Sequence, residues 1–572
     1  MQNIDSQTIA LIGGGPAALL VLKNIIDSQI NASTIFVFEK NERLGVGMPY
    51  GRLGAGKEHV ANVSANELPH FQISFEEYLS QNPTIEFPDF SVDGKCNLYQ
   101  VIPRLLLGNY LEFTFKYYIK EAKKKGIKVI SKTNSVVDDI IKSADGQQFK
   151  ILVNQNKEYS ADKVILCTGH YWPKKYEETK TGWYDSPYPP TKFQLQSNFP
   201  IAIRGTSLTA VDAVKTHSRL NGRYETTSDG QMKYILNEGS ENFRIDMFST
   251  GGFLPALRFH SEEEAYSNDW TMSLDEIYDY KTKNNGFVDL DHVFEINFKL
   301  PLKQKDLDFY NKIKDLSIEE FVKEMMAIRK ELDSFQLFKA EYNEAEKSIR
   351  RHQSISWKEA LSAFSYSMNY PAKHFSAEDM LRLKKTLLPL ISIIIASLPQ
   401  SSYKEIIALH NAGIIDLIQV DRESFVEPHS ESGGIYHYKS VENINSQKHY
   451  QLYIDAVGQQ PLELEDLPFE GLRLGQFVSS AYLNFKDNND AMSLLQNNET
   501  NIRKGYNDNY YMKVPGLEIN DYFQSLNPYG QTVDNVFIMA VPFIGGLNPD
   551  YSGLDFCDTA AERIVKVLKQ QA

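Results

Sequence analysis

The sequence predicts an α/β fold that contains two βαβ units and a helical insertion. Residues 8–12 form a short apolar run rich in β-forming side chains; a glycine turn follows at Gly13, and residues 17–26 have helical apolar spacing. The same order returns at residues 201–204, with a glycine turn at Gly205. Strand, tight turn and helix in this order are typical of a parallel sheet covered by helices.

The length and composition indicate a globular protein of several domains. The chain has 572 residues, of which 42% are hydrophobic and 23% charged. One compact core does not extend over such a length, so we expect two to four packed units.

The charge excludes nucleic acid as a general partner. The formal net charge is −14, whereas phosphate binding needs clustered Lys and Arg. One lysine cluster, at residues 123–125, lies in a helix-like stretch, and we interpret it as a solvated helix face.

The cysteines and histidines predict neither a disulfide framework nor a metal site. Cys96, Cys167 and Cys557 are far apart and form no Cys-x-x-Cys pair, which excludes the chemistry of paired-cysteine reductases. The twelve histidines show no metal-ligand spacing beside cysteines or carboxylates.

No membrane segment is expected. Residues 1–8 contain neither basic residues nor an apolar run, and the longest apolar stretch, 387–398, contains Pro389 and is shorter than the roughly 20 residues of a membrane span. We therefore expect a cytoplasmic protein.

A small antiparallel layer is predicted beside the first unit. Residues 136–141 and 149–153 form two strands around Asp145 and Gly146, a strong hairpin signal, and we expect a third strand at 163–167. This layer should lie against the first sheet.

The second half begins with a helical region. Residues 261–400 are helical and charged, as in 318–332 and 357–364, and we interpret them as an insertion that shapes a substrate pocket or a partner surface. Strand patterns return at residues 450–457 and 535–541. A last helix is expected at residues 554–568.

The first glycine turn carries a dinucleotide-binding pattern. Gly13, Gly15 and Ala18 fit G-x-G-x-x-G/A, in which the glycines allow a tight turn and close approach to a pyrophosphate. Glu39 follows Gly13 by 26 positions, near the roughly 20 expected for the acid that binds ribose hydroxyls. The alternative is a purely structural turn.

The second glycine turn is imperfect. Ser207 replaces the middle glycine, and its side chain should crowd the pyrophosphate. After the next strand, Ser249 and Thr250 provide neither the acid that favours NADH nor the arginine that commonly holds the 2′-phosphate of NADPH. We expect a nicotinamide cofactor here and leave its identity open.

These motifs resemble those of the two-dinucleotide-domain flavoproteins. Within them, the chain is similar to bacterial FAD/NAD(P)-binding proteins related to flavin-containing monooxygenases and to lysine and ornithine N-hydroxylases. The matching segments span nearly the whole chain apart from the helical insertion, and they are residues 13–18, 45–47, 59–62, 168–171, 205–212 and 553–563.

The resemblance implies two Rossmann-like dinucleotide-binding domains, one for FAD and one for NAD(P), with a helical insertion. We expect the FAD-binding domain in two parts, the NAD(P)-binding domain in two parts, and the insertion between the parts of the latter. The boundaries are 1–197 and 461–572 for FAD, 198–260 and 401–460 for NAD(P), and 261–400 for the insertion.

The resemblance also implies the cofactor-binding residues. A final helix that begins at Leu554 would direct its N-terminal dipole at the flavin; the alternative is that it only packs. The FAD set is Gly13, Gly15, Pro16, Ala17, Ala18, Glu39, Lys40, Arg43, Gly45, Gly47, Met48, Asn62, Val137, Thr168, Gly169, Gly553 and Leu554. The NADPH or NADH set is Gly205, Ser207, Leu208 and Thr209.

Asn62 is the candidate catalytic residue. It has a place that resembles the asparagine beside the isoalloxazine of flavin monooxygenases; the alternative is a buried amide that satisfies a loop backbone.

The implied activity is that of an FAD-dependent oxidoreductase. The first hypothesis is a monooxygenase that uses NAD(P)H and molecular oxygen to hydroxylate a small, nucleophilic, amine-like molecule. The longer monooxygenase pattern F-x-G-x-x-x-H is not evident, so two alternatives stay open. They are a flavin reductase or dehydrogenase without oxygenation, and a flavin-binding interaction module with a decayed second nucleotide site.

Overall fold

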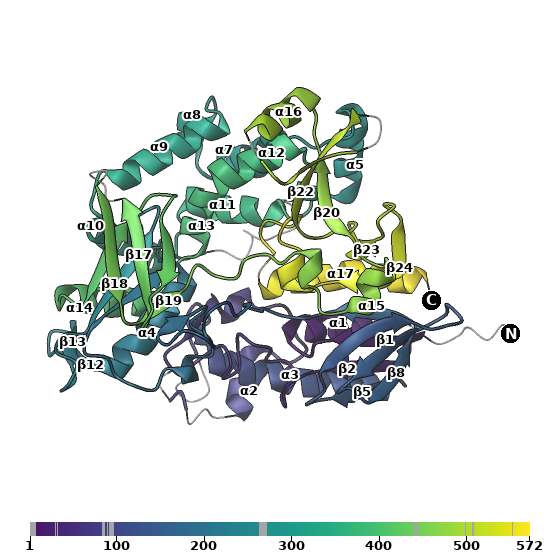
Figure 1. Ribbon diagram of the computed structural model, residues 1–572, viewed down its shortest axis with the longest axis horizontal. Coiled ribbons are helices and arrows are strands. Elements are labelled where there is room, and N and C mark those ends of the chain that lie inside the picture. The colour runs from purple at the N-terminus through teal and green to yellow at the C-terminus, as the bar shows by residue number, and fades with distance from the viewer. Residues whose placement is uncertain are drawn as a thin grey trace.

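The computed structural model describes residues 7–28, 30, 32–82, 86–88, 90, 96–261, 271–439, 444–497, 499–505, 508–551 and 553–571. Two sheets of Rossmann type lie side by side, and a helical region covers them from one side (Figure 1). The mixed α/β fold predicted from the sequence is confirmed.

The first sheet has six strands in the order β23, β24, β9, β1, β2, β5. Strand β1 is parallel to β2 and to β9, and its four central and C-terminal residues are buried. The strands predicted at 8–12 and 34–38 are therefore confirmed. The six are β1 (Gln7–Ile12), β2 (Ala32–Phe38), β5 (Lys128–Lys132), β9 (Lys163–Leu166), β23 (Gln524–Leu526) and β24 (Thr532–Ile538).

The last helix packs against the first helix of the chain. The Asn24 Nδ2 donates to Asp558 Oδ1 over 2.7 Å, and Lys23 Nζ lies 3.4 Å from the same oxygen. Segments more than 500 residues apart thus share one unit (Figure 1). The helices of this unit are α1 (Pro16–Asp27), α2 (Phe75–Gln81), α3 (Arg104–Lys124) and α17 (Leu554–Gln570).

The small antiparallel sheet differs from the prediction in its third strand. It consists of β6 (Val137–Lys142), β7 (Phe149–Val153) and β8 (Lys157–Ala161), whereas residues 163–166 form β9 in the first sheet. Strand β8 was not predicted because its sequence is mostly polar. Its Tyr159 packs on Phe36 and Phe38, so the layer does lie against the first sheet.

The second sheet has five parallel strands in the order β10, β19, β11, β14, β15. The pattern predicted as one strand at 450–457 is in fact the end of β18 and the separate strand β19. The elements of this unit are β10 (Trp183–Tyr184), β11 (Pro200–Arg204), α4 (Leu208–Asn221), β12 (Gly222–Thr226), β13 (Met232–Leu236), β14 (Arg244–Ser249), β15 (Ile415–Gln419), β16 (Phe425–Pro428), β17 (Gly434–Lys439), β18 (Asn445–Tyr450) and β19 (Tyr453–Asp455).

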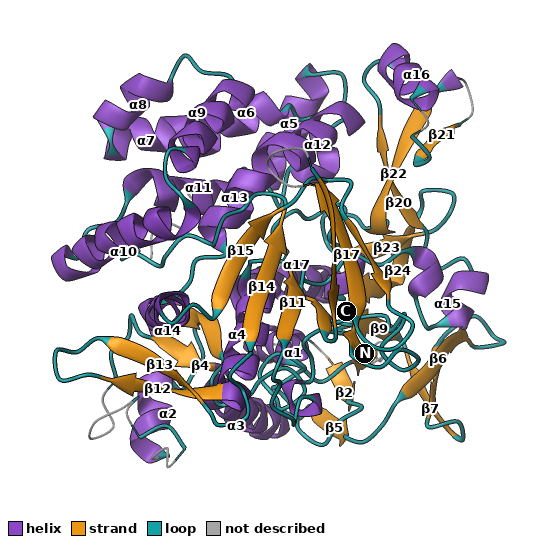
Figure 2. Cartoon of the chain, turned by 60° about the vertical axis from the view of Figure 1, so that its left-hand side comes forward, coloured by secondary structure: helices purple, strands orange, loops and turns teal. Residues whose placement is uncertain are grey.

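The middle of the chain is helical, as predicted. Most of its helices gather above the sheets in Figure 2, while α14 lies lower, near β13. They are α5 (Leu274–Lys283), α6 (Leu290–Phe294), α7 (Leu300–Lys305), α8 (Leu307–Ile313), α9 (Ile318–Lys330), α10 (Ser334–Arg351), α11 (Ser356–Ser367), α12 (Ala377–Arg382), α13 (Leu388–Ile395) and α14 (Gln400–Asn411). Two π-helical turns interrupt them, at Glu295–Lys299 and Leu383–Leu387.

The chain enters and leaves this helical region through paired segments. The Ala256 N–H donates to Ile393 O over 2.9 Å, and the Leu398 N–H donates to Ala256 O over 2.8 Å. The Arg258 N–H donates to Leu398 O over 2.8 Å. The two crossings are therefore fixed to each other.

The remaining elements are short. They are β3 (Val60–Ser64), β4 (Val101–Pro103), α15 (Glu470–Leu474), β20 (Ser480–Asn484), α16 (Asn488–Gln496), β21 (Ile502–Lys504), β22 (Tyr510–Leu517), and 3₁₀ turns at Ala65–Glu67, Pro190–Lys192, Ala372–His374, Leu464–Asp466 and Val541–Phe543. The strand predicted at 535–541 ends at Ile538, and its last residues belong to the turn that follows.

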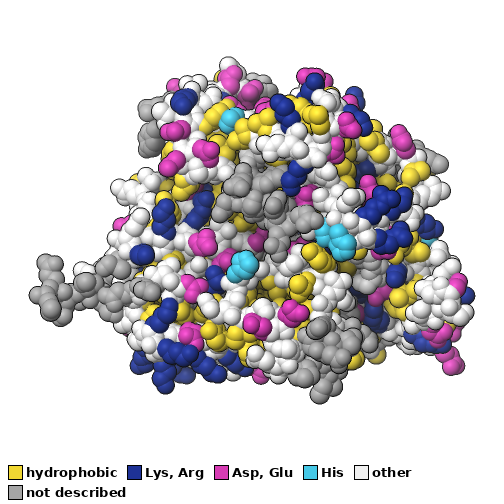
Figure 3. All heavy atoms as spheres, turned by 180° about the vertical axis from the view of Figure 1, so that it is seen from behind, with side chains coloured by type: hydrophobic (Ala, Val, Ile, Leu, Met, Phe, Trp, Pro, Cys, Tyr) yellow, Lys and Arg dark blue, Asp and Glu magenta, His cyan; other side chains and the backbone are white. Residues whose placement is uncertain are grey.

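The surface mixes both signs of charge. In Figure 3, acidic and basic side chains are interspersed over the face seen, with a group of basic side chains at its lower left edge. Within the described ranges, every helix is too short or too polar to span a bilayer.

Candidate dinucleotide-binding site

The turn after β1 has a conformation that requires glycine. Gly13 has a φ of +105°, and a Cβ at this position would lie 2.6 Å from the carbonyl oxygen of Cys167. The Gly13 N–H donates to Phe38 O over 2.8 Å, which fixes the turn at the carboxyl end of the sheet. A side chain here would be strained and would also clash.

The first turn of α1 presents unoccupied backbone donors. Its N-cap residue, Gly15, provides no side-chain cap, Pro16 has the first position, and the first turn contains no acid. Pro16 has no N–H, but the N–H groups of Ala17 and Ala18 point out of the helix end. A helix end of this kind attracts a pyrophosphate through its N–H groups and dipole.

Glu39 lies where a ribose acid is expected. Its side chain is buried, and its Oε2 accepts from the Gly14 N–H over 2.9 Å. Its Oε1 accepts from the backbone and the side-chain amide of Asn41, each over 2.8 Å. A carboxylate has about four acceptor positions, so Glu39 retains capacity for a hydroxyl donor.

The second glycine turn of the first unit meets the first turn. The Gly45 N–H donates to Gly14 O over 2.7 Å, and a Cβ on Gly47 would lie 3.0 Å from Pro16 Cδ. Gly15 faces the Gly47 Cα, with its added Cβ at 3.3 Å. The fold thus brings the two predicted glycine segments together.

Other predicted FAD residues lie around this cradle in different settings. Arg43 is held by α3, because its Nε donates to Glu112 Oε2 over 2.7 Å and its Nη2 donates to Asn109 Oδ1 over 2.8 Å. Lys40 is exposed, and Met48 is half-buried. Arg43 is therefore already paired within the protein.

Val137, Thr168 and Gly169 lie at strand ends. Val137 begins β6 and pairs with Val153, while Thr168 and Gly169 follow β9 directly. A Cβ on Gly169 would meet nothing within 4 Å, so this position is open.

The start of α17 combines a glycine with an acid. Gly553 has a φ of +128°, and Leu554, which begins the helix, is buried. Asp555 lies in the first turn, and its burial raises its pKa to about 6. When Asp555 is ionised, the start of α17 attracts an anion less strongly than the start of α1, which has no acid in its first turn.

The second glycine turn repeats the geometry of the first. Gly205 has a φ of +114°, a Cβ on it would lie 2.6 Å from Ala456 O, and its N–H donates to Phe248 O over 2.7 Å. These values match those of Gly13 with Cys167 and Phe38.

Ser207 takes the place of Gly15 without a change of backbone. The N-cap angles are φ −85° and ψ −168° at Ser207, and φ −81° and ψ −164° at Gly15. Ser207 is exposed and makes no cap hydrogen bond, and the first turn of α4, with Leu208 and Thr209, contains no acid. The backbone of α4 can therefore meet a pyrophosphate as α1 does.

The ribose position of the second unit differs from that of the first. Ser249 occupies the end of β14, where Glu39 follows β2, and its Oγ accepts from the Gly252 N–H over 3.0 Å. Directly before the turn, at the end of β11, Arg204 Nη1 lies 3.1 Å from Asp455 Oδ2. The second site thus has an ion pair beside it and a hydroxyl at the ribose position.

The two connections between the units touch each other. The His170 Nδ1 lies 2.7 Å from Gln459 Oε1, and the Tyr171 N–H donates to the same oxygen over 3.1 Å. Gln459 lies just after β19, where the chain leaves the second sheet. The crossings out of and back into the first unit therefore lie side by side.

Asn62 lies where three segments meet. Its amide donates to Ile395 O over 3.3 Å, and Arg258 Nη1 donates to Asn62 O and Oδ1 over 3.0 and 3.2 Å. The side chain is exposed, so it is not buried as the alternative expected, but it does pair with a backbone carbonyl. Its catalytic role stays a prediction.

A buried ion pair joins the two units, and the sequence did not reveal it. The Arg104 Nη1 lies 2.6 Å from Asp212 Oδ2, which also accepts from Tyr188 Oη over 2.6 Å. The Arg104 Nε donates to Val60 O over 3.0 Å. Arg104 begins α3 and Asp212 lies on α4, so no local pattern could have linked them.

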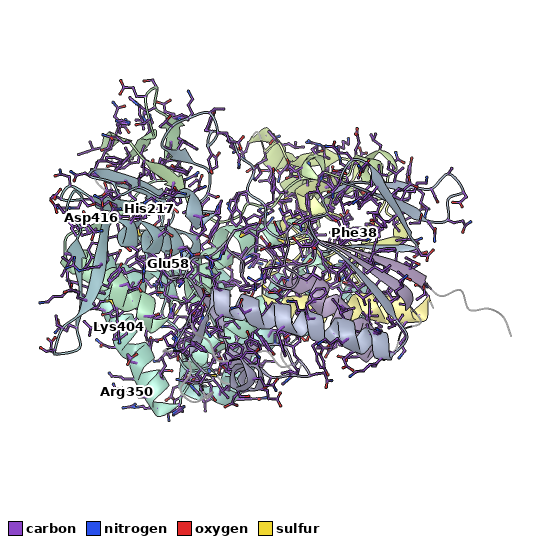
Figure 4. The ribbon with its side chains drawn as sticks, turned by 90° about the horizontal axis from the view of Figure 1, so that it is seen from below. Phe38, Glu58, His217, Arg350, Lys404 and Asp416 are labelled. Carbon is purple, nitrogen blue, oxygen red and sulfur yellow. The ribbon has the colours of Figure 1, made fainter. Side chains whose placement is uncertain are left out.

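His59 extends this contact. Its Nδ1 accepts from the Gly56 N–H over 2.9 Å, so its Nε2 carries the proton and donates to Asp212 O over 3.1 Å. Burial lowers the pKa of His59. The segment before β3 thus reaches across to α4, and Figure 4 shows Glu58 beside His217 of the second unit and far from Phe38 of the first.

The comparisons with known families agree with this geometry. Residues 10–171 match the family described as FAD-NAD(P)-binding, and residues 273–395 match the YdhS-like middle domain. The chain is thus similar to FAD-NAD(P)-binding proteins over its first unit and to YdhS-like proteins over its helical region. The second match covers most of the predicted helical insertion, residues 261–400.

Similar proteins include one curated relative and several solved structures. The chain is 26% identical to the uncharacterized protein YdhS of Escherichia coli over 475 residues, which cover 81% of this chain and 85% of YdhS. The ornithine hydroxylase PvdA of Pseudomonas aeruginosa has 13% identity and a TM-score of 0.45, with 99% of each chain covered. DfoA, a cadaverine monooxygenase of Erwinia amylovora, has 10% identity and a TM-score of 0.44, covering 98% of this chain and 94% of DfoA.

Proposed function

We propose that this YdhS-like chain is an FAD-dependent oxidoreductase that uses NADH or NADPH as its reductant. The observation that carries the proposal is the repetition of the Gly13 turn at Gly205, each with a positive φ and a carbonyl oxygen 2.6 Å from an added Cβ. Two such turns in one chain support two dinucleotides, one to receive and one to supply reducing equivalents.

The first unit fits FAD. Glu39 would accept from a ribose hydroxyl, the uncapped end of α1 would hold the pyrophosphate, and the Gly45 turn leaves backbone close to the extended cofactor. FAD supplies the two-electron chemistry when it is bound, while the protein provides orientation and exclusion of water.

The second unit fits a nicotinamide dinucleotide through α4. Ser207 has the backbone conformation of Gly15, so only its small side chain can hinder the approach of the pyrophosphate. The hydroxyl of Ser249 does not repel a 2′-phosphate as an acid would, and it does not bind one as strongly as an arginine would. The proposal therefore includes both NADH and NADPH.

The finer proposal is a monooxygenase that hydroxylates a small, nucleophilic, amine-like substrate with molecular oxygen. Its support is the resemblance of segments 13–18, 59–62 and 168–171 to flavin monooxygenases, and the exposed amide of Asn62 between three segments. A reductase or dehydrogenase without oxygenation has the same two turns, and the missing F-x-G-x-x-x-H pattern favours it.

The first test is the identity of the cofactor in the purified full-length protein. We expect FAD by absorbance near roughly 450 nm and by mass, and we expect NADH or NADPH to bleach that absorbance on rapid mixing. A protein whose flavin neither dinucleotide reduces would be a flavin-binding interaction module instead.

The second test separates oxygenation from plain oxidation. NAD(P)H consumption, peroxide yield and hydroxylated product are measured with and without a series of small amines. A hydroxylated product formed in step with NAD(P)H consumption supports the monooxygenase. Quantitative peroxide with every amine identifies the reductase.

A further inference from the structure

A series of polar side chains joins the helical region to the C-terminal part of the first unit. Asp521 lies just before β23, His374 ends the 3₁₀ turn at Ala372–His374, and Lys281 lies in the last turn of α5. The His374 Nε2 lies 3.0 Å from Asp521 Oδ1, and Lys281 Nζ lies 2.9 Å from His374 Nδ1. In the view of Figure 1, α5 lies above β23. Asp521, His374 and Lys281 thus form a relay of three side chains.

The carboxylate of Asp521 is fixed and ionised. Its Oδ2 accepts from Tyr278 Oη over 2.8 Å, and its side chain is 4% exposed. Although burial opposes ionisation, the hydrogen bond from His374 and the charge of Lys373 hold the pKa of Asp521 well below its ordinary value. A carboxylate in this position stabilises an imidazolium, as the acid of a Ser-His-Asp triad does.

The relay decides where the protons of His374 lie. An ionised carboxylate only accepts, so the Nε2 that faces Asp521 carries a hydrogen. One hydrogen then lies between His374 Nδ1 and Lys281 Nζ, because a hydrogen bond between two nitrogens needs one donor and one acceptor. The proton is either on Lys281, as an ammonium, or on His374, as an imidazolium. In the second form Lys281 is a neutral amine, which is the nucleophilic form of lysine.

Lys281 has the setting of a reactive amine. It is half-buried, whereas Lys283 of the same helix is exposed. Its nitrogen lies 4.9 Å from the centre of the Tyr278 ring, and in the described part of the chain no carboxylate pairs with it. Burial lowers the pKa of Lys281, and the charge of Asp521 opposes this only in part. The neutral amine is therefore populated at a lower pH than in an exposed lysine.

The remaining charges near the relay are held by other groups. The Lys373 Nζ donates to a backbone carbonyl over 3.2 Å and its side chain is 5% exposed, so a reagent in solution does not reach it. The Arg563 Nη1 donates to Asp521 O over 3.1 Å. Burial raises the pKa of Glu518 to about 7, and its charge acts on Lys373. Lys281 is therefore the amine of this cluster that solvent reaches.

We propose that Lys281 is an acylation site that takes the acyl group of a small acyl phosphate, with His374 as the proton acceptor. One proton moves from Lys281 Nζ to His374 Nδ1, and the lone pair of the nitrogen forms a bond to the acyl carbon. The bond from that carbon to the phosphate oxygen breaks, and phosphate leaves with the electron pair and takes a second proton from the nitrogen. The proposal goes beyond the proposed function, because this step needs neither flavin nor oxygen.

An acyl phosphate suits the chemistry of the relay. His374 provides a proton acceptor for the attacking amine, and phosphate departs without a proton donated by the protein. The amide that forms keeps one hydrogen on the Lys281 nitrogen and carries no charge.

The test is acetylation of the purified full-length protein by acetyl phosphate, followed site by site with peptide mass spectrometry at low conversion. At about pH 7 we expect Lys281 to react about tenfold faster than Lys283 or more, as a pKa lower by one unit implies. Because Lys283 is the more exposed of the two, accessibility alone predicts the opposite order. The ratio should fall towards one as the pH approaches about 10, where an ordinary lysine also loses its proton.

Two results would overturn the proposal in the parent protein. One is a Lys281 rate no higher than that of Lys283 at neutral pH. The other is a ratio of the two rates that does not change with pH, which would mean that the relay does not activate the amine.

His374→Gln tests the proton acceptor. Glutamine keeps an N–H donor for Asp521 but has no nitrogen that can take a proton from Lys281. The Lys281 rate should fall by about tenfold or more, with the Lys283 rate unchanged. His292→Gln, at a half-buried histidine of α6 stacked on Tyr280, is the matched control and should leave both rates unchanged.

A His374→Gln protein that is folded by circular dichroism and keeps the parent ratio would overturn the role of His374. If this variant unfolds, the pH profile of the parent protein decides, since it needs no substitution. Flavin reduction by NAD(P)H, measured on the same preparations, tests the proposed function separately. A protein that is reduced normally but shows no preference for Lys281 rejects only the acylation site.

Discussion

A methyl group on Gly205 would lie 2.6 Å from the carbonyl oxygen of Ala456. That oxygen belongs to the backbone at the end of β19 and cannot move without displacing the strand. The same relationship holds between Gly13 and Cys167 in the first unit. Each glycine is therefore a site at which one methyl group should disable one dinucleotide site and leave the other intact.

Gly205→Ala should remove reduction by NAD(P)H while the protein keeps its flavin. The alanine would combine a strained φ with a backbone clash, and the turn before α4 would shift. Stopped-flow reduction should fall at least tenfold or so in rate at low NAD(P)H, with reduction by dithionite unchanged.

The matched control is Gly230→Ala. Gly230 has a φ of +81° in the same unit, but an added Cβ there meets nothing within 4 Å. It carries only the strain, about 1 kcal/mol. Normal reduction of Gly205→Ala by NADH and NADPH would contradict a nucleotide role for this turn.

Gly13→Ala should abolish FAD binding. The added methyl clashes with Cys167 O, and the Gly13 N–H can no longer hold Phe38 O in the same position. The purified variant should lack the flavin absorbance. Gly126→Ala is the control, because Gly126 has a φ of +80° in open space; retention of stoichiometric FAD by Gly13→Ala would show that this turn is structural.

The sequence predicted the parts of the site that are local in the chain. Gly13, Gly15 and Glu39 lie within one βαβ unit, where spacing reports geometry directly. Ser207 leaves the backbone of the second turn as it is in the first, since its N-cap φ of −85° is open to any residue. Side-chain crowding at Ser207 stays a prediction.

Contacts between distant segments could not be predicted. Arg104 with Asp212 and Lys215 with Glu405 depend on how two units and a helical region pack, and no periodicity encodes such pairs. The strand at 157–161 was missed because it has too few apolar residues to show an alternating pattern. Asn62 was singled out by resemblance alone, and its contacts with Arg258 and Ile395 follow from the route of the insertion.

Breaking the Arg104 and Asp212 pair should destabilise the contact between the units. Asp212→Asn leaves a buried guanidinium without its carboxylate, and such losses are about 3–5 kcal/mol. Arg104→Met with Asp212→Asn should be less destabilised than the sum of the single variants, by roughly 1–3 kcal/mol. Denaturant unfolding measures the cycle, and additive effects would show that the pair does not couple.

Stability of the flavin-free protein should fall as the pH rises from about 4 to about 7. Burial, together with the nearby charge of Asp555, raises the pKa of Asp550 to about 7. An acid with a raised folded-state pKa binds its proton more tightly in the folded protein, so stability is lost as pH rises through that window, by up to about 4 kcal/mol.

Asp550→Asn should flatten this pH dependence, because an amide does not ionise. Unfolding is measured by denaturant at several pH values between 4 and 8 or so. Glu423→Gln, at a side chain that is 82% exposed, should leave the slope as in the parent protein. An unaltered slope in Asp550→Asn would mean that Asp550 is ionised throughout.

Asn369 should control flavin affinity from the helical region. Its Oδ1 accepts from the Asp550 N–H over 2.9 Å, its Nδ2 donates to Asp550 O, and its own carbonyl accepts from Asn548 Nδ2 over 2.9 Å. Asn369 and Asn548 are 2% and 1% exposed. The amide thus fixes the backbone three residues before Gly553, where α17 begins.

Asn369→Ala leaves the N–H and the carbonyl of Asp550 unpaired, which is unfavourable by about 1–3 kcal/mol for each group. We expect the Kd of FAD, measured by fluorescence of the reconstituted protein, to rise by about tenfold or more. Gln336→Ala, at an exposed position on α10, is the control and should leave the Kd unchanged. Equal Kd values for Asn369→Ala and the parent protein would show that the helical region does not position the start of α17. An increase in Kd that is confined to Asn369→Ala would link the helical region to the flavin site.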